Sequence, residues 1–119
     1  MIKILPQSEG NLVAAQASQK LTGEDYSKTW SPLLRDAIAK HGTVRALLYL
    51  DETFEGWEVQ ALWEDAKLGL DNANAFEKIA LVGGSDWLDT IVEWVGHLLK
   101  GSVKTFPAGA LEEALDWIR

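Results

Sequence analysis

The hydrophobic pattern of the chain is organised around residues 44–51. Most side chains in this run are apolar or aromatic, without the strict alternation of a strand that has one wet face. Gly42 precedes the run and Asp51 closes it, so the pattern predicts a strand buried on both faces. Ligands of open α/β sheets usually bind past the carboxyl ends of the strands. A site is therefore expected where segment 52–57 follows this strand.

The pattern on either side predicts further strands and helices in alternation. The predicted strands are 2–5, 11–18, 44–51, 79–82 and 103–106, and the predicted helices are 22–41, 58–71, 85–100 and 111–118. The order ββαβαβαβα predicts an α/β fold with a mostly parallel sheet of about five strands and right-handed crossover helices. Without internal repeats or a linker-like segment, residues 1–119 are expected to form a single domain.

Local signals define the first helix most sharply. Thr22 can cap it, and Asp25 stands three residues later, as in a capping box. Pro32 removes one backbone hydrogen bond and predicts a bend. Gly42 predicts the end of the helix.

Composition favours a folded protein and excludes thiol chemistry. The chain has 119 residues, of which 47% are hydrophobic, and it contains no cysteine. Disulfides and thiolate catalysis are therefore excluded, and the absence of cysteine fits a reducing cytoplasm. No signal peptide and no run of ~20 apolar residues occurs, so we expect a soluble, cytoplasmic protein.

The charge balance argues against two classes of partner. The net charge is −7, and the 11 basic residues are dispersed along the chain. Nucleic-acid-binding proteins usually carry a clustered basic stripe, so no nucleic-acid partner is expected. Anionic lipid also repels an acidic surface, so membrane contact is expected to be peripheral at most.

Helix 85–100 has the widest apolar face that the pattern predicts. Eight large apolar side chains, from Trp87 to Leu99, share an arc of about 160°. Three interpretations stay open. The sheet and neighbouring helices cover this face, or helices 58–71 and 85–100 wall a nonpolar cavity or a movable lid, or the face touches a membrane interface.

Residues that could support chemistry are few. Asp51, Glu52 and Glu55 cluster at the strand end without the spacing of a calcium loop, and we interpret them as solvated surface charge. Residues 83–86 are interpreted as a plain turn with a helix cap. His41 and His97 have no partner at a spacing that suits a metal site or a triad. The sequence therefore predicts no catalytic residue, no metal site and no cofactor.

Several residue strings resemble the SpoIIAA-like family of small bacterial proteins. The most specific section runs from the end of the central strand into the next predicted helix, and the resemblance extends over the whole chain. The strings are Leu50-Asp51, Phe54, Gly56-Trp57, Leu62-Trp63-x-Asp65-x-Lys67-x-Gly69, Phe76-Glu77-Lys78-Ile79-Ala80-x-Val82-Gly83, Trp87, Gly23-x-Asp25-Tyr26, Pro32 and Ala114-x-x-Trp117.

The resemblance implies the fold that STAS domains share with lipid-carrying CRAL-TRIO domains. In STAS antagonists of anti-sigma factors, a serine where the central strand meets its helix is phosphorylated as a switch. Thr53 is the only hydroxyl residue between Asp51 and Trp57, and neither Asp-Ser-Ser nor Asp-Ser-Gly occurs there. The phosphorylation switch is therefore not carried over to this chain.

The leading hypothesis is a non-enzymatic carrier or sensor of a nonpolar small molecule or lipid, held between helices 58–71 and 85–100. A STAS-like protein-interaction module that forms homodimers or binds a protein partner is the alternative. An enzyme acting on an apolar substrate ranks last, because no nucleophile–base pair is seen. The residues predicted to bind the ligand are Phe54, Trp57, Trp63, Leu70, Trp87, Ile91, Trp94, Val95 and Leu98.

Overall fold

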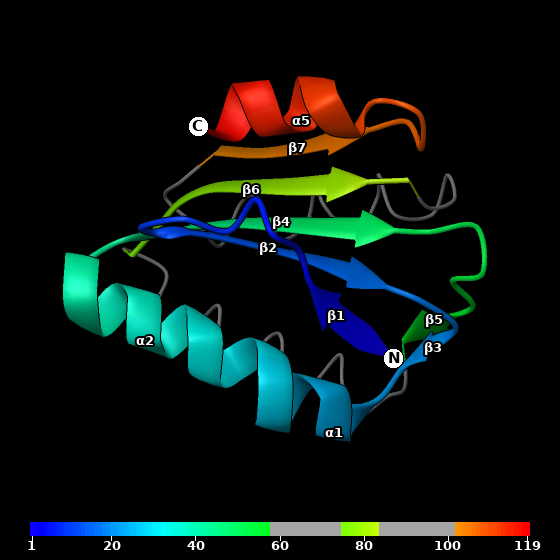
Figure 1. The fold of residues 1–119 in the computed structure, drawn as a ribbon, viewed down its shortest axis with the longest axis horizontal. Helices are drawn as coiled ribbons and strands as arrows, with labels where there is room; N and C mark the ends of the chain where they lie inside the picture. The colour runs from blue at the N-terminus through cyan, green and yellow to red at the C-terminus, as the bar shows by residue number, and fades with distance from the viewer. Residues whose placement is uncertain (58–74, 84–101) are drawn as a thin grey trace.

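The computed structural model describes residues 1–57, 75–83 and 102–119 (Figure 1). In these ranges the chain forms strands, two α-helices of eight or more residues, and one helix of three residues. The strands are β1 (Ile2–Ile4), β2 (Leu12–Ala17), β3 (Lys20–Leu21), β4 (Val44–Leu50), β5 (Gly56–Trp57), β6 (Phe76–Val82) and β7 (Ser102–Phe106). The helices are α1 (Gly23–Asp25), α2 (Ser31–His41) and α5 (Leu111–Ile118).

The main sheet has five strands in the order β1-β2-β4-β6-β7. Strand β1 is antiparallel to β2, whereas β2, β4, β6 and β7 run parallel to one another. The predicted α/β class and mostly parallel five-stranded sheet are thereby confirmed. The predicted helices 58–71 and 85–100 lie outside the described residues.

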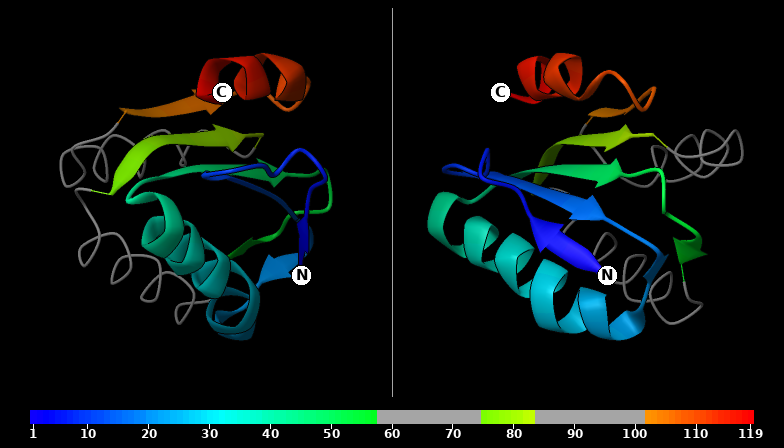
Figure 2. Two further views of the ribbon diagram at one scale, coloured as in Figure 1. Left: turned by 60° about the vertical axis from the view of Figure 1, so that its left-hand side comes forward. Right: turned by 45° about the vertical axis from the view of Figure 1, so that its right-hand side comes forward.

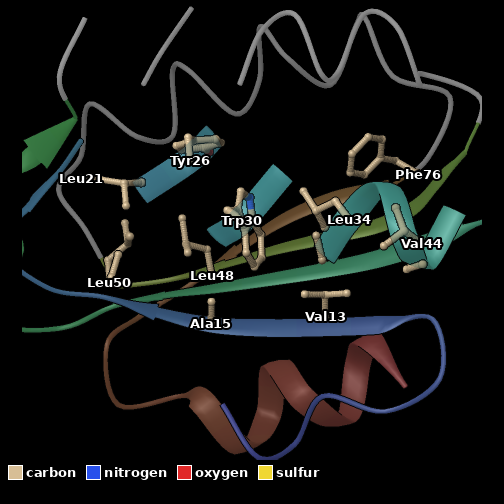
Figure 3. Packing of buried hydrophobic residues seen from close by; sticks show 13 residues of the cluster. Val13, Ala15, Leu21, Tyr26, Trp30, Leu34, Val44, Leu48, Leu50 and Phe76 are labelled. Carbon is tan, nitrogen blue, oxygen red and sulfur yellow. The ribbon is translucent and has the colours of Figure 1, made fainter. Parts of the chain in front are cut away.

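Helices α2 and α5 lie on opposite faces of the sheet (Figures 1 and 2). The carboxyl ends of the parallel strands lie at the same edge of the sheet (Figure 1). On one face, Trp30 and Leu34 pack against β2 residues such as Val13 and Ala15 (Figure 3). On the other face, Leu115 and its helical neighbours pack against Leu47 and Leu12. Both faces are therefore buried, which explains why β2 and β4 lack an alternating pattern.

The first helix begins as predicted and is irregular further along. The Thr22 hydroxyl accepts a 3.0 Å hydrogen bond from the Asp25 N–H, and the Asp25 carboxylate accepts one of 3.0 Å from the Thr22 N–H. Residues Tyr26–Trp30 then form a π-helical segment before α2 begins. The Ser31 N–H bonds back to the Tyr26 carbonyl, and Pro32 follows in the first turn of α2, so the bend expected at Pro32 stays a prediction. Gly42, at φ 77°, ends α2.

Apart from one-residue shifts at strand ends, the strands differ from prediction in two respects. Strand β6 begins at Phe76 rather than at residue 79, because the half-buried Glu77 and Lys78 interrupt the apolar pattern between Phe76 and Ile79. Strands β3 and β5 were not predicted. They form a separate two-residue parallel pair, Lys20 with Gly56 and Leu21 with Trp57, and so short a pairing leaves no periodicity in the sequence.

Candidate functional site

A cleft of about 750 Å³ lies at the carboxyl ends of β2 and β4. Strands β2 and β4 supply its floor, segment 51–56 one wall, and the turn between β7 and α5 contributes to the other side. The described lining residues are Gln16, Tyr49, Leu50, Asp51, Glu52, Thr53, Phe54, Glu55, Gly56, Ala108 and Gly109. This volume is in the range of small-molecule sites, and the position past the strand ends is the one predicted from the sequence.

The register of the sheet brings two of the lining side chains together. Gln16 on β2 pairs with Tyr49 on β4, so their side chains share a face of the sheet. Tyr49 packs beside the core that α5 covers, which places the cleft on the α5 side. Figure 1 shows the segment after β4 and the β7–α5 turn at the same edge of the sheet.

Asp51 is the centre of the hydrogen bonds in the cleft wall. Its Oδ2 accepts a hydrogen bond from Gln16 Nε2 at 2.9 Å and another from the Ser18 hydroxyl. Its Oδ1 accepts two from Thr53, at 2.9 Å from the backbone N–H and at 2.7 Å from the hydroxyl. The carboxylate thus joins the end of β2 to the segment after β4.

This arrangement stabilises the ionised form of Asp51. Burial alone would raise the pKa of the carboxyl, but the hydrogen bonds from Ser18, Thr53 and Gln16 outweigh it and lower the pKa to about 2. The interpretation as solvated surface charge does not fully describe Asp51, which is half-buried and hydrogen-bonded. It does describe Glu52 and Glu55, whose side chains are exposed.

The described part of the cleft offers binding groups but no pair for acid–base or nucleophilic chemistry. A carboxylate with a pKa of about 2 is a weak base near neutral pH. The hydroxyls of Ser18 and Thr53 donate to that carboxylate, and His41 ends α2 beyond the opposite end of β4. Within residues 1–57, 75–83 and 102–119, no group of three or more His, Asp or Glu side chains is arranged to hold a metal ion.

One predicted ligand residue lines this cleft. Phe54 does so while packing partly against the core on the α2 face. The backbone of Trp57 forms β5. The other predicted ligand residues lie outside the described residues, so their role stays a prediction: Trp63, Leu70, Trp87, Ile91, Trp94, Val95 and Leu98.

The contribution of Ala108 and Gly109 was not predicted. These residues follow β7 and carry no chemical signal of their own, and only the strand order brings their turn to the cleft. Gln16 was likewise missed, because a single polar residue near the end of a buried strand has several structural explanations. Among the described helices, none is long and apolar enough to cross a membrane.

Comparison with known proteins agrees with this fold. The family model described as SpoIIAA-like matches residues 12–119. The chain is also similar to the crystal structure of an uncharacterized protein of the DUF3478 family with a SpoIIAA-like fold, from Shewanella loihica PV-4. The two are 30% identical, the match covers 99% of this chain and 93% of that one, and the TM-score is 0.73. No curated protein matches. The chain therefore belongs to the SpoIIAA-like family.

Proposed function

We propose that this domain is a non-enzymatic binding module that holds a small, largely nonpolar molecule in the cleft past β2 and β4. The observation that carries the proposal is the cleft itself, because about 750 Å³ is enough for a ligand of a few hundred daltons. Tyr49 and Phe54 offer apolar contact, and the Gln16 amide offers a polar contact.

The charges of the cleft restrict the ligand. Asp51, Glu52 and Glu55 line it, and the described lining residues include neither lysine nor arginine. A ligand with an anionic head group would meet repulsion at this wall, so the proposed ligand is neutral or carries a positive group. This favours a neutral or cationic molecule over an anionic lipid.

The proposed ligand site differs from the site predicted from the sequence. The predicted site lay between helices 58–71 and 85–100, which are not described, whereas the cleft is built from described strands and turns. Phe54 belongs to both sets of residues. A carrier or sensor role is compatible with either position, and a site on rigid strands also needs less ordering when the ligand binds.

The test is a fluorescence titration with the neutral dye Nile red. The Ala108→Trp variant places a large side chain in the cleft at an exposed turn position, so it should weaken dye binding about tenfold or more while the fold remains intact. Ala39→Trp is the matched control, because Ala39 is exposed on α2 away from the cleft. Equal loss in both variants, or in neither, would contradict the proposal.

A protein-interaction module is the second candidate. It is favoured by the exposed side chains of Glu52, Thr53 and Glu55 on a segment that hydrogen bonds hold in one conformation. An acidic, preformed surface suits a basic protein partner. Light scattering after size-exclusion chromatography, run over a range of concentrations, tests the homodimer form of this candidate. A constant monomer mass would contradict that form.

A further inference from the structure

We infer that Gln19 is the positioning residue of the cleft wall, and that it acts through its backbone rather than its side chain. The inference rests on the proposed function, because the wall it positions is one side of the proposed ligand site. Gln19 lies between β2 and β3, and its side chain is exposed. It does not itself line the cleft.

The backbone of Gln19 has an unusual conformation. Its φ is 55°, and it is the one residue other than glycine with a positive φ among the described residues. The left-handed region is unfavourable for a residue with a Cβ, and such strain persists where surrounding contacts hold the backbone in place. The Gln19 side chain is exposed, so the backbone contacts are the cause to consider.

Both polar backbone groups of Gln19 bind the cleft wall. Its N–H donates a 3.2 Å hydrogen bond to the Thr53 hydroxyl oxygen, and its carbonyl accepts a 2.7 Å hydrogen bond from the Glu55 N–H. Thr53 in turn donates to Asp51. The left-handed residue therefore connects directly to two lining residues and indirectly to a third.

The residues on either side of Gln19 extend this attachment. The Ser18 hydroxyl donates to the Asp51 carboxylate, and strand β3, which follows Gln19, pairs with β5 at the end of the same wall. Segment 18–21 thus holds segment 51–57 at four consecutive positions. Within segment 18–21, only Gln19 has a positive φ.

These contacts hold the wall in one conformation before a ligand binds. If the wall keeps one conformation in the free protein, the ligand does not have to order it, and less binding free energy is lost. A glycine at position 19 adopts the same φ without strain, whereas a β-branched residue strongly resists it. Replacements at this one exposed position therefore separate the role of the backbone from that of the side chain.

The experiment measures amide hydrogen exchange by NMR and Nile red affinity in Gln19→Gly, Gln19→Ala and Gln19→Val. In Gln19→Val, exchange of the Glu55 amide should be roughly tenfold faster or more, while β4 amides stay protected, and dye affinity should fall by a similar factor. Gln19→Gly should match the wild type within about twofold in both measurements, and Gln19→Ala should lie between them. Protected β4 amides show that the fold is retained, and Gln19→Ala keeps the test available if the valine variant does not fold.

Three results would overturn the inference. Unchanged Glu55 exchange in Gln19→Val would show that the wall does not depend on this backbone. Equal loss in Gln19→Gly and Gln19→Val would assign the effect to the side chain. Faster Glu55 exchange with unchanged dye affinity would show that dye binding does not depend on the conformation of the wall. In that case, the Ala108→Trp titration shows whether the cleft is the site at all, which distinguishes failure of this inference from failure of the proposed function.

Discussion

Gly83 approaches Leu50 so closely that a Cβ at position 83 would lie 2.4 Å from the Leu50 carbonyl oxygen. The approach joins the carboxyl ends of β6 and β4, at the edge of the sheet where the cleft lies. Gly83 also has a φ of 87°, and its N–H donates a 2.8 Å hydrogen bond to the Phe106 carbonyl. Three neighbouring strands therefore meet at a position that only glycine can occupy without displacement.

The first prediction is that Gly83→Ala destabilises the fold. Both the contact with Leu50 and the positive φ oppose a Cβ, so the free energy of unfolding should fall by about 2–4 kcal/mol. Urea denaturation followed by circular dichroism measures it. Gly109→Ala is the matched control, since a Cβ there has no atom within 4 Å, and a change near zero is expected. Similar losses in the two variants would contradict the steric explanation.

The second prediction concerns the pH dependence of stability that Asp51 contributes. Because the pKa of Asp51 is lowered to about 2 in the folded protein, its hydrogen bonds stabilise the fold above the unfolded pKa near 4. That contribution should be complete at neutral pH and should disappear as the pH falls from about 4 to 2. We expect about 1–2 kcal/mol, since partial exposure screens the interaction.

The contribution of Asp51 is measured as the difference in stability between wild type and Asp51→Asn at each pH. The comparison is needed because other carboxyl groups titrate in the same range. An amide cannot accept the four hydrogen bonds that the carboxylate accepts, so the variant should be less stable than wild type at pH 6. The difference between wild type and variant should shrink steadily toward pH 2. A difference that stays constant over this range would show that Asp51 does not titrate as described.

The third prediction tests the start of the first helix. Thr22→Ala removes the hydroxyl that accepts from the Asp25 N–H, and it should lower the free energy of unfolding by about 1 kcal/mol. Ser27→Ala, at an exposed position in the following turn, should change it by less than about 0.5 kcal/mol. Chemical denaturation distinguishes the two. An equal change in the free energy of unfolding in the two variants would contradict a stabilising capping box.

The fourth prediction concerns how α5 is held against the sheet. Arg45 on β4 donates to the Ile118 carbonyl at 2.9 Å, and Lys78 on β6 donates to the Trp117 carbonyl at 2.8 Å. Cationic donors at the carboxyl end of a helix satisfy its last carbonyls and interact favourably with its dipole.

Arg45→Met and Lys78→Met should therefore loosen the last turn of α5. Amide exchange in that turn should become about fivefold to tenfold faster in each variant, with smaller changes in α2. Lys3→Met, on β1, replaces an exposed lysine and serves as the control. Uniformly faster exchange across the molecule would instead indicate a general loss of stability.

The features that sequence predicted well are those with local signals. The two-sided burial of β4 follows from its unbroken apolar run, and the capping box follows from Thr22 and Asp25 at fixed spacing. Each of these depends on residues close together in the chain.

The features that were missed depend on contacts between distant segments. Nothing in the sequence indicates that Gln19 adopts a left-handed conformation, since glutamine rarely does so and the cause lies in Thr53 and Glu55. Asp51 resembles its exposed neighbours in sequence, yet Gln16 and Ser18 make it the centre of a hydrogen-bonded network. Ala108 reaches the cleft only through the strand order.

The most direct test of the central claim is native mass spectrometry of freshly purified protein, with organic extraction of whatever is bound. The proposed function predicts an adduct of a few hundred daltons on the wild type and on Ala39→Trp, lost on denaturation and absent from Ala108→Trp. A bare chain mass in all three proteins, or the same adduct on Ala108→Trp as on the wild type, would contradict the assignment of this cleft as the ligand site.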